Sequence, residues 1–300
     1  MNSTGIPNQA GRVKVDVRVP GLAYYFPLDK WENGKFSDAG PFKIEGSSWA
    51  LPLEFYKGVV GNAVHNPSLG VRGYIHYPDV SPPGRCSVSV SLWVLYPDAE
   101  SLKNDGVIIT HGGCMAGMIE GGSRSGWGIG HLSGGKGFKF AGNVSQREET
   151  SFDLRSDEVI QPLKWYHLAV VFDRDTQKMR AWVNNKEILK SDRTPNIPDG
   201  VMDSVGGVYL FNGYVWKSGR ATRALLDEVR VYTAVLTPNQ IATLYVEGRD
   251  AVAPDFNNGL IKQPAAEAGQ GRRGRRGGPA QEVPRDGHPP DDTPKDEMPE

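Results

Sequence analysis

The sequence predicts an all-β fold in which two antiparallel sheets pack face to face as a sandwich. About a dozen short segments alternate apolar with polar residues and are separated by turn residues, a pattern typical of sandwiches. One segment, 237–248, carries the signals of an α-helix. After residue 250, Gly, Pro, Arg and Asp dominate and aromatic residues become rare. That composition predicts a disordered tail over 251–300.

The folded domain is expected over residues 21–250. Within residues 1–20, valines alternate from Val13 to Val19, which predicts an N-terminal edge strand or arm. The first strand of the domain is expected in GLAYYFPLD at 21–29, which ends in a carboxylate, and a loop-rich segment follows it.

The strongest strand signal is SVSVSLWVLY at 87–96, followed by a turn region and the apolar run GVIITH at 106–111. We expect these two strands to form an antiparallel hairpin. With the turn centred near Ser101, Cys86 and Cys114 would face each other across the ladder, where opposite Cβ atoms approach disulfide range. A Cys86–Cys114 disulfide is therefore predicted, and two buried free thiols are the alternative.

Two further strands, WYHLAVVFD at 165–173 and KMRAWV at 178–183, flank the turn at 174–177. Apolar residues on both faces of the first predict a central strand that is covered on each side. His167 on this strand is therefore interpreted as a core or sheet-face residue rather than a catalytic base.

The helix is predicted from its capping residues. Thr237 is a good N-cap, Pro238 suits the first helical position, and Gln240 completes a capping box. Gly248 is expected to end the helix in the left-handed conformation.

The segment ALLDEVRVY at 224–232 reads as a strand with one local inconsistency. Strict alternation would place Leu225, Asp227 and Val229 on one face, and Glu228 on the other. A carboxylate on an apolar face costs free energy unless it is hydrogen-bonded, paired or metal-bound. Asp227 is therefore the sharpest functional pointer in this strand.

Several segments in order resemble the laminin G-like, concanavalin A-like lectin/glucanase family over roughly residues 21–248. The resemblance implies a jelly-roll sandwich that binds glycans or proteins outside the cell, often with calcium. The segments are Leu28-Asp29, SVSLWV at 89–94, WYHLAVVFD at 165–173, KMRAWVNNKE at 178–187, and LDEVRVYTAVLTPNQIATLY at 226–245.

In a jelly roll the first and last strands commonly pair, which would bring Asp29 close to Asp227. Two neighbouring carboxylates need a cation or a shared proton. Calcium suits oxygen ligands, and Asp38 in the following loop can add one. A calcium site at Asp29, Asp38 and Asp227 is the metal hypothesis. The alternative is that Asp227 accepts backbone N–H groups or pairs with an arginine.

A loop at 212–223 interleaves aromatic with basic residues, which can stack on a sugar or hold an acidic glycan. The alternative is that the aromatic residues pack under the loop and the charges form a solvated rim. The candidate ligand-binding residues are Tyr214, Trp216, Lys217, Arg220 and Arg223.

Composition excludes some classes of function. The formal net charge of −1 gives no electrostatic case for nucleic acid, and no apolar run approaches the ~20 residues that span a bilayer. A glucanase on this fold would resemble enzymes with an E-x-D-x-E run on one strand, and the sequence has none.

We therefore expect a non-catalytic, extracellular module that recognises glycan or protein, with calcium as an assisting ion. Two alternatives from other classes are a glycoside-active enzyme and a structural module of a larger assembly without its own ligand.

Overall fold

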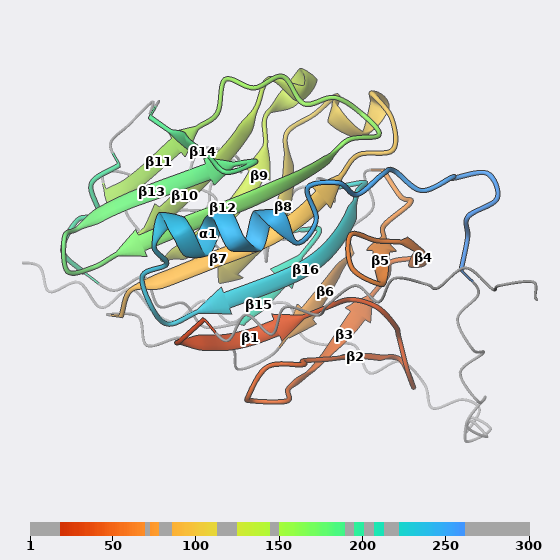
Figure 1. Cartoon of the computed structure of the whole chain (residues 1–300), viewed down its shortest axis with the longest axis horizontal. Helices are drawn as coiled ribbons and strands as arrows, with labels where there is room; N and C mark the ends of the chain where they lie inside the picture. Colours follow the sequence, from red (N-terminus) through yellow and green to blue (C-terminus); the bar gives the residue numbers. More distant parts are fainter. Residues whose placement is uncertain are drawn as a thin grey trace, which may run out of the picture. The chain divides into compact units, whose positions relative to one another are not determined.

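The computed structural model describes residues 19–69, 73–77, 86–112, 125–144, 150–189, 195–200, 207–212 and 222–261. Over these residues the chain forms two eight-stranded antiparallel sheets and one α-helix, α1 (Pro238–Val246) (Figure 1). The prediction of an all-β sandwich with one short C-terminal helix is confirmed.

The first sheet, sheet A, is built around β7 (Val88–Leu95), which lies between β12 (Trp165–Asp173) and β16 (Leu225–Tyr232). Strand β1 (Leu22–Phe26) pairs antiparallel with β16, so the expected pairing of the first and last strands is confirmed. The remaining strands of sheet A are β13 (Lys178–Val183) and β14 (Lys186–Ile188) on one side, and β5 (Asn62–His65) and β4 (Glu54–Lys57) on the other.

The second sheet, sheet B, begins at one edge with β11 (Ser151–Arg155), β10 (Phe138–Asn143), β9 (Gly126–His131) and β8 (Gly106–Gly112). It continues with β15 (Val208–Leu210), β6 (Tyr74–Tyr77), β3 (Glu45–Trp49) and β2 (Lys35–Ser37). Two short 3-10 helices, η1 (Glu100–Leu102) and η2 (Ser133–Gly135), lie in the connections.

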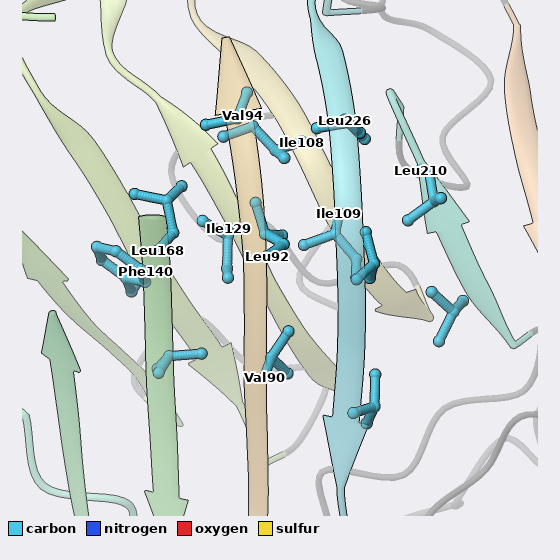
Figure 2. Packing of buried hydrophobic residues seen from close by; sticks show 14 of the residues in the cluster. Val90, Leu92, Val94, Ile108, Ile109, Ile129, Phe140, Leu168, Leu210 and Leu226 are labelled. Atoms are coloured by element: carbon cyan, nitrogen blue, oxygen red, sulfur yellow. The ribbon is translucent and has the colours of Figure 1, made fainter. Parts of the chain in front are cut away.

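The main core fills the space between the sheets. Val90, Leu92 and Val94 point from β7 toward sheet B, where Ile109 and Ile129 belong to the same buried cluster (Figure 2). Because side chains alternate along a strand, the serines of β7 point to the other face of sheet A. That face is also covered, since every residue of β7 is buried.

The predicted hairpin of β7 with β8 is wrong, because the two strands lie in opposite sheets. Both edges of β7 are occupied by β12 and β16, and β8 pairs instead with β9 and β15. The turn region between them therefore crosses from one sheet to the other. Because this hairpin does not form, Cys86 and Cys114 are not placed opposite each other by strand pairing. Cys86 is exposed, and Cys114 lies outside the described residues.

Helix α1 lies over the outer face of sheet A (Figure 1). Its N-terminus has the predicted capping box, in which the Thr237 hydroxyl accepts a hydrogen bond from the Gln240 backbone N–H. Ile241 and Leu244 pack on Val171 and Tyr232 of the sheet, as expected for an amphipathic surface helix.

Gly248 was predicted to end α1 in the left-handed conformation, but the structure gives a different reason for a glycine at this position. Gly248 is not among the glycines with positive φ, so it does not end the helix in the left-handed conformation. A Cβ at this position would instead lie 1.9 Å from Val59 Cγ1 and 2.8 Å from the indole of Trp93. The glycine is therefore required by close packing of the chain against sheet A.

Residues 251–261 fall in the segment for which composition predicts a disordered tail, yet they lie against the sandwich. Ala251, Ala253 and Phe256 pack on a buried cluster on the outer face of sheet A. The backbone N–H of Ile261 donates to the carbonyl of Phe55 at 2.7 Å. The predicted valine strand before Val19 and the tail from 262 to 300 lie outside the described residues.

Strand β16 does not keep the strict alternation predicted for it. Its pairing with β7 shifts between Asp227 and Arg230, and Glu228 has a φ of 53°. This β-bulge reverses the phase of the strand. Val229 therefore points into the inter-sheet core, whereas Leu225 belongs to the outer cluster. The placement of Asp227 and Val229 on one face, with Glu228 opposite, is wrong.

Candidate functional site

A pocket of about 540 Å³ lies where the β4–β5 hairpin meets the connection after β7 and the segment that follows α1. Such a volume falls within the ~300–1,000 Å³ of ordinary small-molecule sites. Its lining combines aromatic rings with ionisable side chains. The lining residues are Glu54, Tyr56, His65, Pro67, Pro97, Asp98, Leu163, Arg223, Pro254, Asp255, Phe256 and Asn257.

One wall of the pocket is a hydrogen-bonded group on the β4–β5 hairpin. Glu54 and His65 are paired in register, and His65 Nδ1 lies 3.0 Å from Glu54 Oε2. The Tyr56 hydroxyl donates to the same oxygen at 3.2 Å. Burial lowers the pKa of His65 more than the Glu54 carboxylate raises it, so the imidazole is neutral near neutral pH.

The neutral state fixes which nitrogen of His65 carries the proton. A carboxylate only accepts hydrogen bonds, so Nδ1–H donates to Glu54 and Nε2 is left as an acceptor. Nε2 is buried and has no hydrogen-bond partner within the described part of the chain. An acceptor of this kind is satisfied by a buried water molecule or by a donor group of a ligand.

The opposite wall carries an ion pair. Arg223 lies 2.9 Å from Asp98 Oδ2, and Asp98 Oδ1 accepts hydrogen bonds from the backbone and hydroxyl of Ser101. Partial burial raises the pKa of Asp98, but these hydrogen bonds and the guanidinium outweigh it and hold the pKa below its usual range. Arg223 Nε is buried and has no hydrogen-bond partner among the described residues, which leaves one donor unused.

The aromatic part of the pocket comes from both ends of the fold. The rings of Tyr56 and Phe256 lie 5.0 Å apart between centroids, and Phe256 meets His65 edge-on at 5.6 Å. Asp255 fixes the turn that presents Phe256, because its carboxylate accepts the backbone N–H groups of Asn257 and Asn258. An Asx turn in the polar segment 254–259 is the local sequence signal that could have identified it.

Arg223 is the one predicted ligand-binding residue that the structure describes, and it lines this pocket. The other four, Tyr214, Trp216, Lys217 and Arg220, lie outside the described residues. Sequence reasoning missed Glu54, Asp98 and Phe256, because they come from three distant segments that carry no shared motif.

The predicted metal ligands occupy two different places. Asp227 Oδ2 accepts the backbone N–H groups of Val59 and Val60 at 2.7 and 3.1 Å. Asp29 Oδ1 accepts the backbone N–H of Asn62 at 2.7 Å, so both carboxylates hold the same turn between β4 and β5. Burial and the neighbouring Glu228 raise the pKa of Asp227 well above its usual range, despite the two N–H groups.

Asp38 lies on a different element. Its Oδ1 accepts the backbone N–H groups of Tyr25 and Gly40 at 2.8 and 2.6 Å. The described residues contain no group of three or more His, Cys, Asp or Glu side chains that could hold a metal ion. The geometry thus favours the hydrogen-bonding alternative for Asp227, and calcium stays a prediction.

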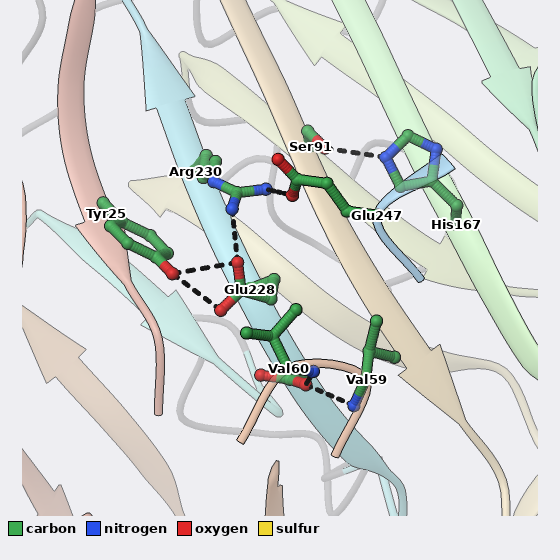
Figure 3. Close-up of polar contacts among 9 residues, drawn as sticks. Tyr25, Val59, Val60, Ser91, His167, Glu228, Arg230 and Glu247 are labelled. Atoms are coloured by element: carbon green, nitrogen blue, oxygen red, sulfur yellow. Dashed lines mark hydrogen bonds and ion pairs between the residues drawn. The ribbon is translucent and has the colours of Figure 1, made fainter. Parts of the chain in front are cut away.

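A second polar group lies on the outer face of sheet A, where Glu247 just after α1 reaches it (Figure 3). The Tyr25 hydroxyl donates to both oxygens of Glu228, Arg230 pairs with Glu228, and its other nitrogen lies 2.9 Å from Glu247 at the end of the helix. Burial raises the pKa of Glu228, and Arg230 opposes that rise. Glu228 is only 1% exposed, and the side chains of Arg230 and Glu247 are 12% and 13% exposed, so the network is largely shielded from solvent.

His167 lies in the same layer and is fully buried, as the sequence indicated. Its Nε2 lies 2.8 Å from Ser91 Oγ. Burial and the charge of Arg230 together lower the pKa of His167 to about 3. The imidazole is therefore a neutral packing residue, and it is not among the residues that line the pocket.

Comparisons with known proteins establish the family. Residues 69–242, more than half of the chain, match the family described as the concanavalin A-like lectin/glucanases superfamily. The chain belongs to this family. No curated protein sequence matches it.

Solved structures share the fold at low sequence identity. Domain 4 of AbnA, a GH43 extracellular arabinanase from Geobacillus stearothermophilus in complex with arabinotriose, is 20% identical with a TM-score of 0.54. That match covers 75% of this chain and 98% of the domain. Trypanosoma rangeli sialidase in complex with sialic acid is 13% identical with a TM-score of 0.55, covering 78% of this chain and 34% of the sialidase.

A mutant of HCR/D is 14% identical with a TM-score of 0.54, covering 75% of this chain and 52% of that protein. At these identities the likeness shows the fold alone. This chain spans about a third of the length of the sialidase chains that it matches. None of the helices within the described ranges is long and apolar enough to cross a membrane.

Proposed function

We propose that this domain is a non-catalytic module that binds glycans outside the cell, with the pocket between the β4–β5 hairpin and Phe256 as its binding site. Membership of the concanavalin A-like lectin/glucanases superfamily supports a carbohydrate ligand. Domain 4 of AbnA has this fold, and its solved structure is a complex with arabinotriose. AbnA is an extracellular arabinanase. These facts support a glycan as the ligand and an extracellular location.

The observation that carries the proposal is the pairing of unused polar atoms with aromatic rings. His65 Nε2 is an unpartnered acceptor and Arg223 Nε an unpartnered donor, beside the rings of Tyr56 and Phe256. A sugar hydroxyl both donates and accepts, and the apolar face of a sugar ring packs on an aromatic ring. A glycan unit therefore offers what each part of the lining lacks.

The electrostatics of the pocket argue against hydrolysis. A glycosidase needs one carboxylic acid that holds its proton and a second carboxylate as nucleophile or base. Asp98 has a lowered pKa, which makes it a poor acid. The described carboxyl groups with raised pKa values are Asp227, Glu228 and Glu247, and none of them lines the pocket.

A glycan array probed with the full chain tests the proposal, followed by titration calorimetry on the strongest neutral oligosaccharide. Replacing Arg223 with Gln removes a donor and is expected to weaken binding about tenfold. Arg180→Gln is the matched control, since Arg180 lies on β13 in an exposed pair with Glu187. An array without hits would favour the structural-module alternative, and product release from a β-glucan panel would favour the enzyme.

Calcium is a separate and untested part of the proposal. If Asp29 and Asp227 hold calcium, the melting temperature rises when calcium is added and falls with EDTA, and Asp227→Asn abolishes the difference. An unchanged melting temperature excludes the ion. The Cys86–Cys114 disulfide also stays a prediction, which the intact mass of the non-reduced chain decides.

A further inference from the structure

A second, smaller pocket of about 200 Å³ adjoins the proposed glycan site. Leu163 lines both pockets. Ala253 lines the second pocket, and the next residue, Pro254, lines the first. Its walls come from β7, the start of β12, the end of α1 and the segment that follows the helix. The lining residues are Trp93, Leu163, Lys164, Trp165, Asn184, Tyr245, Arg249, Ala251, Val252 and Ala253.

Two tryptophans in the lining of the second pocket have unused hydrogen-bond donors. Trp93 and Trp165 are 2% and 5% exposed, and neither indole Nε1 has a hydrogen-bond partner among the described residues. An indole N–H only donates, so an acceptor is the group that satisfies it. Trp93 is held in place by Tyr245, whose ring stacks at 5.9 Å, and by the close approach of Gly248.

The charges of the second pocket are cationic. Lys164 and Arg249 line it, and no acidic side chain is among its described lining residues. Each cation has an acidic neighbour outside the pocket, with Lys164 3.2 Å from Glu158 and Arg249 3.5 Å from Asp250. These ion pairs are largely exposed and therefore weak, so Lys164 and Arg249 can still attract an anion.

The first pocket has the opposite balance. Among its described lining residues, the acidic Glu54, Asp98 and Asp255 stand against the single cation Arg223. An anionic group is therefore disfavoured in the first pocket and favoured in the second. The second pocket is also smaller than the ~300 Å³ at which ordinary ligand sites begin, so it suits a substituent rather than a whole oligosaccharide unit.

We propose that the second pocket binds the acidic substituent, a carboxylate or a sulfate, of a glycan whose neighbouring unit fills the first pocket. The inference rests on the proposed glycan-binding function and specifies its ligand as an acidic glycan. The oxygens of the substituent accept from the two indole N–H groups, and Lys164 and Arg249 balance its charge.

The test compares oligosaccharides that differ only in the acidic group. One arm pairs a uronate-containing oligosaccharide with its carboxyl-reduced form, and the other pairs a sulfated oligosaccharide with its desulfated form. We expect the acidic member of one arm to bind the full chain about tenfold more tightly at low salt, with a smaller advantage at high salt. The arm that shows the advantage identifies the substituent.

Variants then locate the preference. The double variant Lys164→Gln, Arg249→Gln is expected to bind both members of the pair equally. The control Lys178→Gln is expected to keep the preference, because Lys178 of β13 pairs with Asp173, at the opposite end of β12 from Trp165. Indole N–H resonances, assigned through Trp93→Phe and Trp165→Phe, are expected to shift with the acidic oligosaccharide and to stay in place with the neutral one.

The outcomes separate the two proposals. If neutral and acidic oligosaccharides bind equally, and Arg223→Gln weakens both, the acidic-substituent inference is wrong and the glycan-binding function stands. If an acidic preference persists in the double variant, the second pocket is not its source. If no oligosaccharide of either kind binds, the proposed function itself fails.

Discussion

Two regions of sheet A use the same residue types for opposite purposes. Beneath α1, Tyr25, Glu228 and Arg230 form a network in which the helix-end residue Glu247 completes the charge balance. In the pocket at the end of the sheet, His65 and Arg223 each keep one unpartnered nitrogen.

The difference teaches that coverage decides the role of a polar group. Charges under the helix are removed from water and must satisfy one another, so they contribute to the fold. Unpartnered atoms alone do not separate the two regions, since His167 Nδ1 beneath the helix is also without a hydrogen-bond partner among the described residues. His65 and Arg223 differ in that they line a pocket, and the proposed function therefore assigns them to binding. Burial raises the pKa values of Tyr25 and Glu228 in the network, whereas in the pocket burial lowers the pKa of His65, and hydrogen bonds and Arg223 hold that of Asp98 low.

The largest expected effect comes from breaking the closed network. Arg230→Met removes the cation between Glu228 and Glu247 and leaves the buried Glu228 with only the Tyr25 hydroxyl as a partner, at a cost of about 3–5 kcal/mol in the free energy of unfolding. Urea denaturation measures the loss. Arg180→Met is the control, because it breaks an exposed pair and should cost less than about 1 kcal/mol. Equal losses would remove the distinction between the two regions.

The pH dependence of stability sharpens the comparison next. The folded-state pKa of His167 is about 3 against an ordinary value of 6.5, so its contribution is present above pH 6.5 and is lost as pH falls toward 3. Between pH 7 and pH 4, the free energy of unfolding should therefore fall less for His167→Gln than for the native chain. The two decreases should differ by up to about 3 kcal/mol. Parallel pH profiles for the native chain and His167→Gln would contradict the prediction.

A smaller effect is expected where the helix end meets the sheet. Gly248→Ala places a Cβ against Val59 and Trp93, and such overpacking costs about 1–3 kcal/mol. Gly248→Asn separates this explanation from a helix-ending role, since asparagine tolerates the left-handed conformation. Thermal unfolding should show both variants destabilised. A tolerated asparagine would restore the helix-ending interpretation.

The smallest change in stability is expected in the open region. Phe256→Ala removes a ring that packs on Tyr56 and His65, and should weaken glycan binding about fivefold to tenfold while unfolding changes little. Calorimetric titration measures the affinity. Phe42→Ala is the control, because Phe42 is exposed and packs on Tyr24 instead. Undiminished affinity of Phe256→Ala would place the ligand elsewhere.

The sequence by itself determined the local structure of this protein. Alternation at 87–96 and at 165–173, and the capping residues from Thr237 to Gln240, specify strands and a helix that the structure confirms. These signals were readable because periodicity and caps depend on residues a few positions apart. Arg223 was also identified as a candidate, since an arginine beside aromatic residues suggests binding without any tertiary information.

The tertiary structure alone decided how these elements combine. It placed β8 in the sheet opposite β7, set the bulge at Glu228, and laid Phe256 beside Glu54 and Asp98. Each of these outcomes depends on contacts between residues far apart in the chain, and an alternation pattern is the same whichever partner a strand pairs with. The pocket therefore has no signature in the sequence, although every residue that forms it is visible there.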